Sequence, residues 1–205
     1  MSKYEYIGAI LEYLLKKGPS SKYAISKGTA IPYSTVLRKL PEMDAAYIIQ
    51  QVAKGKRGAE IYMITPKGAL LAYFGGHVRT PELFVALPAI MKHVRVSLAE
   101  LPAVSNPLEF ILAELPFKLS RLEDLKAEEA VSILGLILIW RHDEWYHEIG
   151  KEELKRLLSW KENYQILRLL IAGSVNTLRK MSEQATRLSE LADKFLLEIE
   201  ELRER

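Results

Sequence analysis

The chain has 205 residues, of which 49% are hydrophobic and 27% charged, so it can bury a core and is not a disordered or collagen-like chain. It contains no cysteine, which excludes disulfides, thiolate metal sites and cysteine nucleophiles. No signal-peptide pattern opens it, and its most apolar stretch, 130–140, is shorter than the roughly 20 residues that cross a bilayer. We therefore expect a soluble, cytoplasmic protein with no membrane partner.

Charge is distributed unevenly along the chain. Residues 1–80 carry 12 Lys and Arg against 5 Asp and Glu, whereas the remainder carries 17 against 21. A basic segment attracts polyanions by long-range electrostatics. The N-terminal part is therefore the part expected to meet a nucleic acid.

Proline and glycine divide the chain into three regions. Residues 1–76 alternate short apolar segments with Gly and Pro, as in a small α+β unit. Residues 77–118 hold five prolines and predict a helical connector of short, angled pieces. Residues 119–205 contain no proline and are rich in helix-forming residues. The expected fold class is mainly α: an α+β N-terminal domain followed by an all-helical, coiled-coil-like dimerisation region.

Three helices are expected in the first region, over 4–15, 21–27 and 32–40. Pro32 suits the first position of the third helix, where Val36, Leu37 and Leu40 are expected to face inward. The opposite face then presents polar side chains near the helix N-terminus, the part that meets base edges in helix-turn-helix proteins. These candidate DNA contacts are Tyr33, Ser34, Thr35, Arg38 and Lys39.

A β-hairpin is expected next. Residues 47–52 and 60–65 are rich in β-branched and aromatic side chains, as strands are. The loop over 53–59 holds two glycines and three cations, and such a tip can lie along a phosphate backbone. The cations are Lys54, Lys56 and Arg57, and Lys22 of the second helix completes the candidate set. A charged turn that serves only solubility is the alternative interpretation.

The N-terminal part, over about residues 3–75, resembles the winged helix-turn-helix transcriptional regulators and most closely their PadR-like branch. The resemblance rests on Ile31 to Val36 (IPYSTV) and on Tyr62 to Gly68 (YMITPKG). It implies that the third helix reads the major groove, that the hairpin is a wing on adjacent phosphates or the minor groove, and that C-terminal helices dimerise. Ala30 stands where the turn of these regulators usually has glycine, and Pro41 is expected to end the third helix early.

A heptad register runs from Leu157 to Leu202, and only Ser174 departs from its apolar pattern. This pattern predicts a two-stranded coiled coil between two copies. Weak helix formers around Gly173 and Asn176 leave a bend open, and an intramolecular bundle and both strand orientations stay open as well. The expected dimerisation residues are Leu178, Met181, Ala185, Leu188, Ala192, Phe195, Ile199 and Leu202.

No motif indicates catalysis, a cofactor or a metal. The sequence has no phosphate loop, nucleophile elbow or zinc-protease helix. Asp143 and His147 stand four residues apart, but without a third ligand they are expected to form an exposed ion pair. A small-molecule effector is not indicated either, because aromatic residues that could line a pocket are expected to be core. They are Phe84, Phe110, Phe117, Trp140 and Trp145.

Taken together, these patterns favour a homodimeric transcriptional regulator, acting as a repressor by occlusion. It would hold two winged helices about 34 Å apart on double-stranded operator DNA. An architectural or DNA-segregation protein is one alternative, and a protein-interaction adaptor is another. A regulator should bind its site orders of magnitude more tightly than random DNA, an architectural protein should not, and an adaptor should bind neither.

Overall fold

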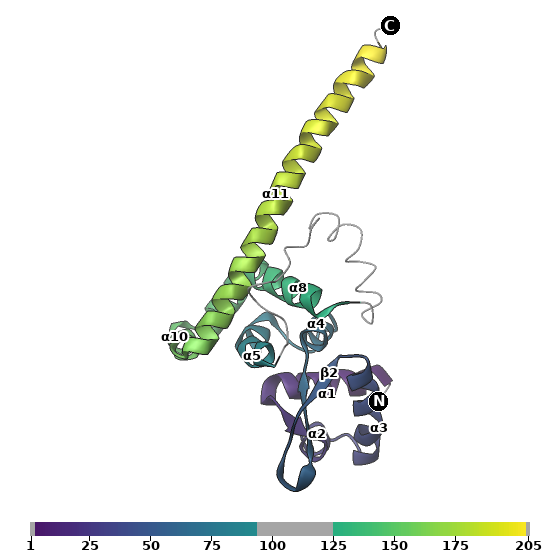
Figure 1. The fold of residues 1–205 in the computed structure, drawn as a ribbon, viewed down its shortest axis with the longest axis vertical. Coiled ribbons are helices and arrows are strands. Elements are labelled where there is room, and N and C mark those ends of the chain that lie inside the picture. Colours follow the sequence, from purple (N-terminus) through teal and green to yellow (C-terminus); the bar gives the residue numbers. More distant parts are fainter. Residues whose placement is uncertain (1–2, 94–124, 204–205) are drawn as a thin grey trace.

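The computed structural model describes residues 3–93 and 125–203 (Figure 1). Within these ranges the chain is 77% helix, in nine helices, with a small three-stranded antiparallel sheet, as expected for a mainly α class. The N-terminal part contains α1 (Lys3–Lys17), β1 (Ser20–Ser21), α2 (Lys22–Thr29), α3 (Tyr33–Ala45), β2 (Ile49–Lys54), β3 (Glu60–Ile64) and α4 (Pro66–Phe74). It is followed by α5 (Thr80–Lys92), α8 (Ala127–Trp140), α9 (His142–Ile149), α10 (Lys151–Ser159) and α11 (Lys161–Arg203).

Both expected hairpin strands form, although β2 spans Ile49–Lys54 and not 47–52, and a two-residue strand that the sequence did not predict joins them. The sheet order is β1-β3-β2, with Ser20 opposite Tyr62 and Gln51 opposite Tyr62 on the other side. Thr65 closes the sheet against α4, because its Oγ1 donates to the carbonyl of Tyr47 at 2.7 Å and accepts from the amide of Gly68 at 3.1 Å. This buried threonine fixes where the hairpin ends and α4 begins.

Two helices run through a proline, contrary to expectation. Pro41 lies inside α3, which continues to Ala45, and Pro88 lies inside α5. A proline in a helix removes one backbone hydrogen bond, which usually ends the helix. Here apolar residues are buried on both sides of each proline: Leu40 and Met43 in α3, and Leu83, Leu87, Ile90 and Met91 in α5. Packing of these side chains sustains the helices despite the lost bond.

The heptad-bearing segment divides at Trp160 and not at Gly173. Leu157 belongs to α10, Trp160 lies between the helices, and α11 is one helix of 43 residues that passes through Gly173 without interruption. Ser174 is buried against α8, where an added Cβ on Gly135 would lie 2.0 Å from the Ser174 Oγ. The polar break in the heptad pattern therefore marks a close crossing of α8 and α11, and the bend proposed there is wrong.

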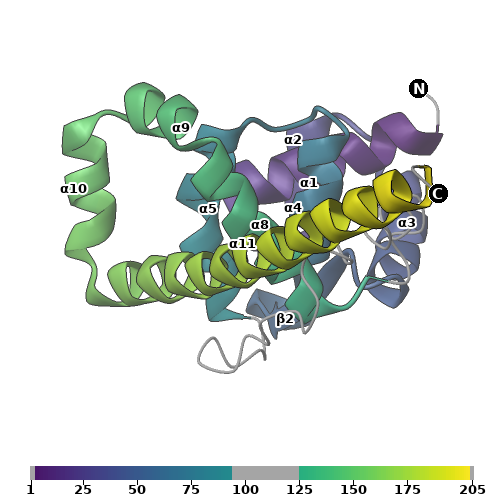
Figure 2. The ribbon, with the colours of Figure 1, turned by 90° about the horizontal axis from the view of Figure 1, so that it is seen from above.

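One hydrophobic cluster connects the two halves of the described chain. It includes Leu14 of α1, Leu70 of α4, Leu87 of α5, Leu134 of α8 and Leu170 of α11. In Figure 1, α2, α3 and the hairpin tip lie at one end of the molecule, and α11 extends from the body toward the opposite end. Figure 2 shows α9 and α10 as the connection between α8 and the start of α11.

Candidate nucleic-acid interface

The N-terminal half of α3 presents a polar, solvent-exposed surface. Tyr33 is 47% exposed, Ser34 and Arg38 are exposed, and Thr35 is half-buried. Val36 and Leu40 are fully buried, as expected for the inward face. No side chain caps the first turn, whose N-cap residue is Pro32. Backbone amides at such a helix start point outward and bind anions.

Two residues of α3, Lys39 and Leu37, lie on the opposite faces to those predicted. Lys39 was expected on the exposed face, yet its side chain is only 9% exposed and its Nζ lies 2.6 Å from a carboxylate oxygen of Glu42. Leu37 was expected inside but is 42% exposed. With about 100° per residue, position 39 falls on the same stripe as 36, 40 and 43, whereas position 37 falls off it. Leu37 is therefore accessible to a partner, and Lys39 is not.

The hairpin tip carries exposed cations. Lys54 ends β2 opposite Glu60, and Lys56 begins a short 3-10 turn, Lys56–Gly58. The turn is closed by the amide of Gly55, which donates to the carbonyl of Ala59 at 2.7 Å. Both lysines are exposed, and Lys56 has no ion-pair partner among the described residues. The Arg57 side chain lies outside the described part. The end of the hairpin therefore carries at least two exposed positive charges.

Lys22 is engaged in a contact within the protein. Its Nζ pairs with the carboxylate of Glu60 on β3 and lies 5.7 Å from the ring centre of Tyr62, whose hydroxyl donates to Glu60 at 2.9 Å. The hydrogen bond from Lys22 lowers the pKa of Glu60, and the same bond raises the pKa of Lys22. Since the charged forms favour each other, this cluster ties α2 to the base of the hairpin. Glu60 and Tyr62 were not predicted to take part.

Two exposed residues of α2 were also missed. Tyr23 is 68% exposed and Lys27 is exposed, while Ile25 between them is fully buried. Their spacing of four residues places them on one face of the helix. This spacing, opposite the buried isoleucine, was the sequence signal that could have identified them.

The predicted dimerisation residues lie on the part of α11 beyond the α8 crossing. Leu178 is 39% exposed, Ala185 is exposed and Met181 is half-buried. For Leu188, Ala192, Phe195, Ile199 and Leu202 only the helical backbone is described. No described side chain of α11 after Ser174 is buried. In this single chain the heptad stripe therefore has no covering element at Leu178 and Ala185.

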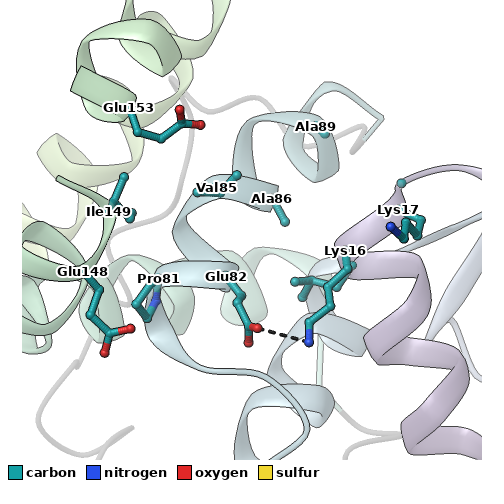
Figure 3. A pocket seen from close by; sticks show the side chains of 12 residues that line it. Lys16, Lys17, Pro81, Glu82, Val85, Ala86, Ala89, Glu148, Ile149 and Glu153 are labelled. Atoms are coloured by element: carbon teal, nitrogen blue, oxygen red, sulfur yellow. Dashed lines mark ion pairs between the residues drawn. The ribbon is translucent and has the colours of Figure 1, made fainter. Parts of the chain in front are cut away.

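Ion pairs and an open groove mark the junction between the N-terminal elements and the helical region. Lys16 of α1 contacts Glu82 of α5 at 3.1 Å, and Arg79 contacts Glu148 of α9 at 2.8 Å. Figure 3 shows Lys16 reaching Glu82, with Val85 and Ala86 between α1 and the α9–α10 side. Two residues of the expected connector thus make contacts on opposite sides: Glu82 contacts α1, and Arg79 contacts α9. Positions 94–118 of the connector lie outside the described residues.

The remaining sequence expectations concern membrane, metal and aromatic residues. None of the described helices combines the length and apolarity that a membrane span requires, and the described residues form no cluster of three or more metal-ligand side chains. The expected pair of Asp143 with His147 is wrong, because the Asp143 carboxylate lies 3.2 Å from Nδ1 of its neighbour His142. Phe84 stacks on Trp145 in the core, as expected, whereas Trp140 is 87% exposed, contrary to expectation. Phe110 and Phe117 lie outside the described residues.

Comparisons with protein-family models, with curated proteins and with solved structures found no match to this chain. The candidate nucleic-acid interface is therefore described from the structure of this chain alone. It comprises the exposed N-terminal half of α3 and the cationic hairpin tip, which share one end of the molecule (Figure 1). The Lys22–Glu60 pair joins α2 to that hairpin.

Proposed function

We propose that this chain is a sequence-specific transcriptional regulator of the winged helix-turn-helix class, PadR-like, that binds double-stranded DNA as a homodimer. The observation that carries the proposal is the combination of an exposed polar face on α3 with the exposed lysines Lys54 and Lys56 on the hairpin at the same end of the molecule. In this proposal α3 enters the major groove and the hairpin is the wing on the flanking phosphates. Lys22 positions the wing through Glu60.

The side chains of α3 favour base readout over simple charge attraction. Both carboxylates of α3, Glu42 and Asp44, lie in its last turn, about two helical turns or more beyond Tyr33 and Ser34. Hydroxyl groups hydrogen-bond to several base edges, and arginine binds guanine through two hydrogen bonds. We therefore assign specificity to the start of α3 and general affinity to Lys54, Lys56 and Arg57.

Fluorescence-anisotropy titration at several salt concentrations tests the proposal, with a random duplex and a site selected from a random library. Lys56→Ala/Arg57→Ala should lower the slope of log affinity against log salt by about 2, one for each lost phosphate contact. Arg38→Ala should weaken the selected site by about tenfold or more while changing random DNA less. Lys151→Ala/Lys155→Ala removes the same charge from α10 and should leave both affinities unchanged.

Equal affinity for the selected and random duplexes would replace the regulator by the architectural alternative. Absence of salt-dependent DNA binding would leave the protein-interaction adaptor. A monomeric mass at micromolar concentration would contradict the homodimer.

Dimer geometry offers a second test. Because α11 extends away from the DNA-binding end, parallel pairing of two copies keeps both DNA-binding ends together, whereas antiparallel pairing separates them (Figure 1). The regulator therefore requires parallel helices, and the architectural alternative, which bridges two duplexes, favours antiparallel ones. The chain has no cysteine, so introduced cysteines report without background.

Single substitutions Leu178→Cys and Ala185→Cys lie one heptad apart on the exposed stripe. Under mild oxidation both should form disulfide-linked dimers if the helices are parallel, whereas antiparallel helices bring at most one of these positions to its own copy. Glu183→Cys, on the opposite side of the helix, is the control that should stay monomeric on a denaturing gel.

A further inference from the structure

The exposed face of α3 carries one large side chain that has no polar atom. Tyr33 and Leu37 are the large hydrophobic residues of this helix that solvent reaches, and of the two only the tyrosine can form a hydrogen bond. Leu37 is 42% exposed, whereas its neighbours Val36 and Leu40 are fully buried. Single exposed leucines are common on protein surfaces, so the meaning of this one depends on where it lies.

Leu37 lies within the candidate DNA-binding face and not at its border. Counted from Tyr33 at about 100° per residue, Leu37 lies at about 40° and Arg38 at about 140° around the helix. Ser34, at about 100°, lies between them. Leu37 is thus four residues from Tyr33 and three from Ser34, the spacings at which side chains on a helix are neighbours. Tyr33, Ser34 and Arg38 are all exposed, so an apolar spot lies inside a surface of hydrogen-bonding groups.

Double-stranded DNA offers one apolar group of matching size in its major groove. The C5-methyl group of thymine projects there, whereas the other groups by which the base pairs differ are hydrogen-bond donors and acceptors. Contact between a leucine and this methyl group removes apolar surface of both molecules from water. A donor or acceptor placed against Leu37 would instead lose its water without gaining a hydrogen bond. The leucine can therefore select for thymine.

A protein partner fits this surface less well. The core of a protein–protein interface is an apolar patch in which charged residues are depleted. Around Leu37 the exposed face presents the hydroxyl groups of Tyr33 and Ser34 and the guanidinium of Arg38. A lone apolar side chain among polar groups matches the major groove, in which thymine methyl groups stand among donors and acceptors.

We propose that Leu37 is a specificity-determining residue that packs against the C5-methyl group of a thymine in each half-site. This inference rests on the proposed function, because it requires α3 to enter the major groove. It goes further by assigning one base, beside the base pairs that the polar residues of α3 contact. Cytosine methylated at C5 carries the same methyl group in the major groove and should satisfy the same contact.

Removal of a single methyl group from the DNA tests this contact without altering the protein. Deoxyuridine differs from thymidine only by lacking that methyl group, so each thymine of the selected duplex is replaced in turn. Fluorescence anisotropy with the full-length chain should show about a fourfold loss of affinity at one thymine of each half-site, as expected for one buried methyl group. The same replacements in a random duplex should leave the affinity unchanged.

A protein variant tests whether Leu37 makes the contact. Leu37→Ala should bind the selected duplex at least about fourfold more weakly and should no longer distinguish thymine from deoxyuridine at that position. Leu169→Ala is the control, because it truncates a leucine of α11 with 41% exposure and should retain the fourfold difference. A cytosine at that position should bind the parent protein about fourfold more tightly when methylated at C5, and Leu37→Ala should not respond to the methyl group.

The outcomes separate this inference from the proposed function. If the chain prefers its selected site but no deoxyuridine lowers the affinity, the Leu37 contact is wrong and the regulator stands. Equal deoxyuridine losses in Leu37→Ala and in the parent protein would assign the methyl group to another residue and also overturn the inference. If the parent protein prefers no site over random DNA, the proposed function fails and this inference fails with it.

Discussion

The N-terminal elements and α11 obtain their order in different ways. The helices and strands of residues 3–74 are short, and contacts between distant positions hold them, as when Thr65 donates to the carbonyl of Tyr47. Helix α11 is 43 residues long, and after Ser174 its described side chains are exposed or half-buried. Its far part is held by its own backbone hydrogen bonds, which alone stabilise a helix weakly in water. The first region is held by packing within the single chain, whereas the described part of α11 beyond Ser174 contributes no buried side chain.

The two regions also differ in the kind of atom that approaches a glycine closely. At Gly68 in α4 a backbone carbonyl from another element lies where a Cβ would be, while at Gly135 in α8 the obstacle is a side chain. A pinned backbone cannot move aside, but a side chain can turn or be removed. Substitutions at these two positions compare the rigidity of the two regions directly.

The largest effect is expected at Gly68. A Cβ there would lie 2.0 Å from the carbonyl oxygen of Ile48, which is held by the amide of Thr65 at 3.1 Å and its hydroxyl at 3.0 Å. Gly68→Ala should therefore lower the free energy of unfolding by about 3 kcal/mol. Urea denaturation followed by circular dichroism measures the change. A loss below about 1 kcal/mol would show that the β2–α4 contact yields easily.

A smaller loss is expected at Gly135. The obstacle is the Ser174 Oγ at 2.0 Å, and alanine also favours the helix, so Gly135→Ala should cost about 1 kcal/mol. Ser174→Ala removes the obstructing oxygen and should restore most of the loss in the double variant. The double-mutant cycle in urea gives the coupling free energy, and additive losses would contradict a direct contact.

A gain in stability is expected at the turn after α2. Ala30 has φ of 56°, in the left-handed region that costs an L-residue about 1–2 kcal/mol. Ala30→Gly should raise the free energy of unfolding by about 0.5–1 kcal/mol, after the entropy cost of glycine. Ala46, which follows α3 with φ of −81°, is the matched control. Ala46→Gly should lower stability, and thermal melts of the two variants should shift in opposite directions.

The smallest effect concerns two ion pairs, the half-buried Lys22–Glu60 pair and the exposed Lys92–Glu162 pair. The hydrogen bond from Lys22 lowers the pKa of Glu60, and that from Lys92 lowers the pKa of Glu162. Since each folded-state pKa lies below the unfolded value, the stabilisation is present at neutral pH and is lost as pH falls through the lowered pKa. Glu60→Gln and Glu162→Gln should therefore destabilise at pH 7 and match the parent protein in acid below both pKa values.

The two ion pairs should differ in how much they stabilise the folded chain. Glu60 accepts from both Lys22 and Tyr62, whereas one donor, Lys92, acts on Glu162. The urea midpoint of Glu60→Gln at pH 7 should therefore lie further below that of the parent than the midpoint of Glu162→Gln does, and both gaps should close as pH falls. Equal pH dependence in both variants and the parent would contradict these contacts in solution.

Local sequence patterns predicted the helices and strands well where apolar residues repeat with a single helical or strand period. Strands over 47–52 and 60–65 and the inward positions Val36 and Leu40 follow directly from alternation and helical spacing. The same helical spacing places Lys39 on the buried stripe and Leu37 off it, against what the polarity of the two side chains suggests. A lysine can lie along a buried stripe when its aliphatic stem packs and its amine reaches a carboxylate, here that of Glu42.

Features that depend on distant contacts could not be predicted from local patterns. Helix α3 passes Pro41 because tertiary packing outweighs one lost hydrogen bond, and Ser174 in the heptads is explained by Gly135, far earlier in the chain. The Lys22–Glu60 pair likewise joins residues that no spacing rule connects. The candidate DNA-binding residues on the hairpin could be named from sequence, because a cationic loop between two predicted strands is a local pattern.

Helix α11 also has a mechanical consequence. From its crossing with α8 at Ser174 it runs on to Arg203, a distance of about 40 Å at about 1.5 Å per residue. A tilt of about 5° at the crossing would carry the far end through about 4 Å. The length of α11 beyond the close Gly135–Ser174 contact would thus amplify any tilt at the crossing. Movements too small to break a hydrogen bond at the crossing become displacements of side-chain size at the far end of the helix.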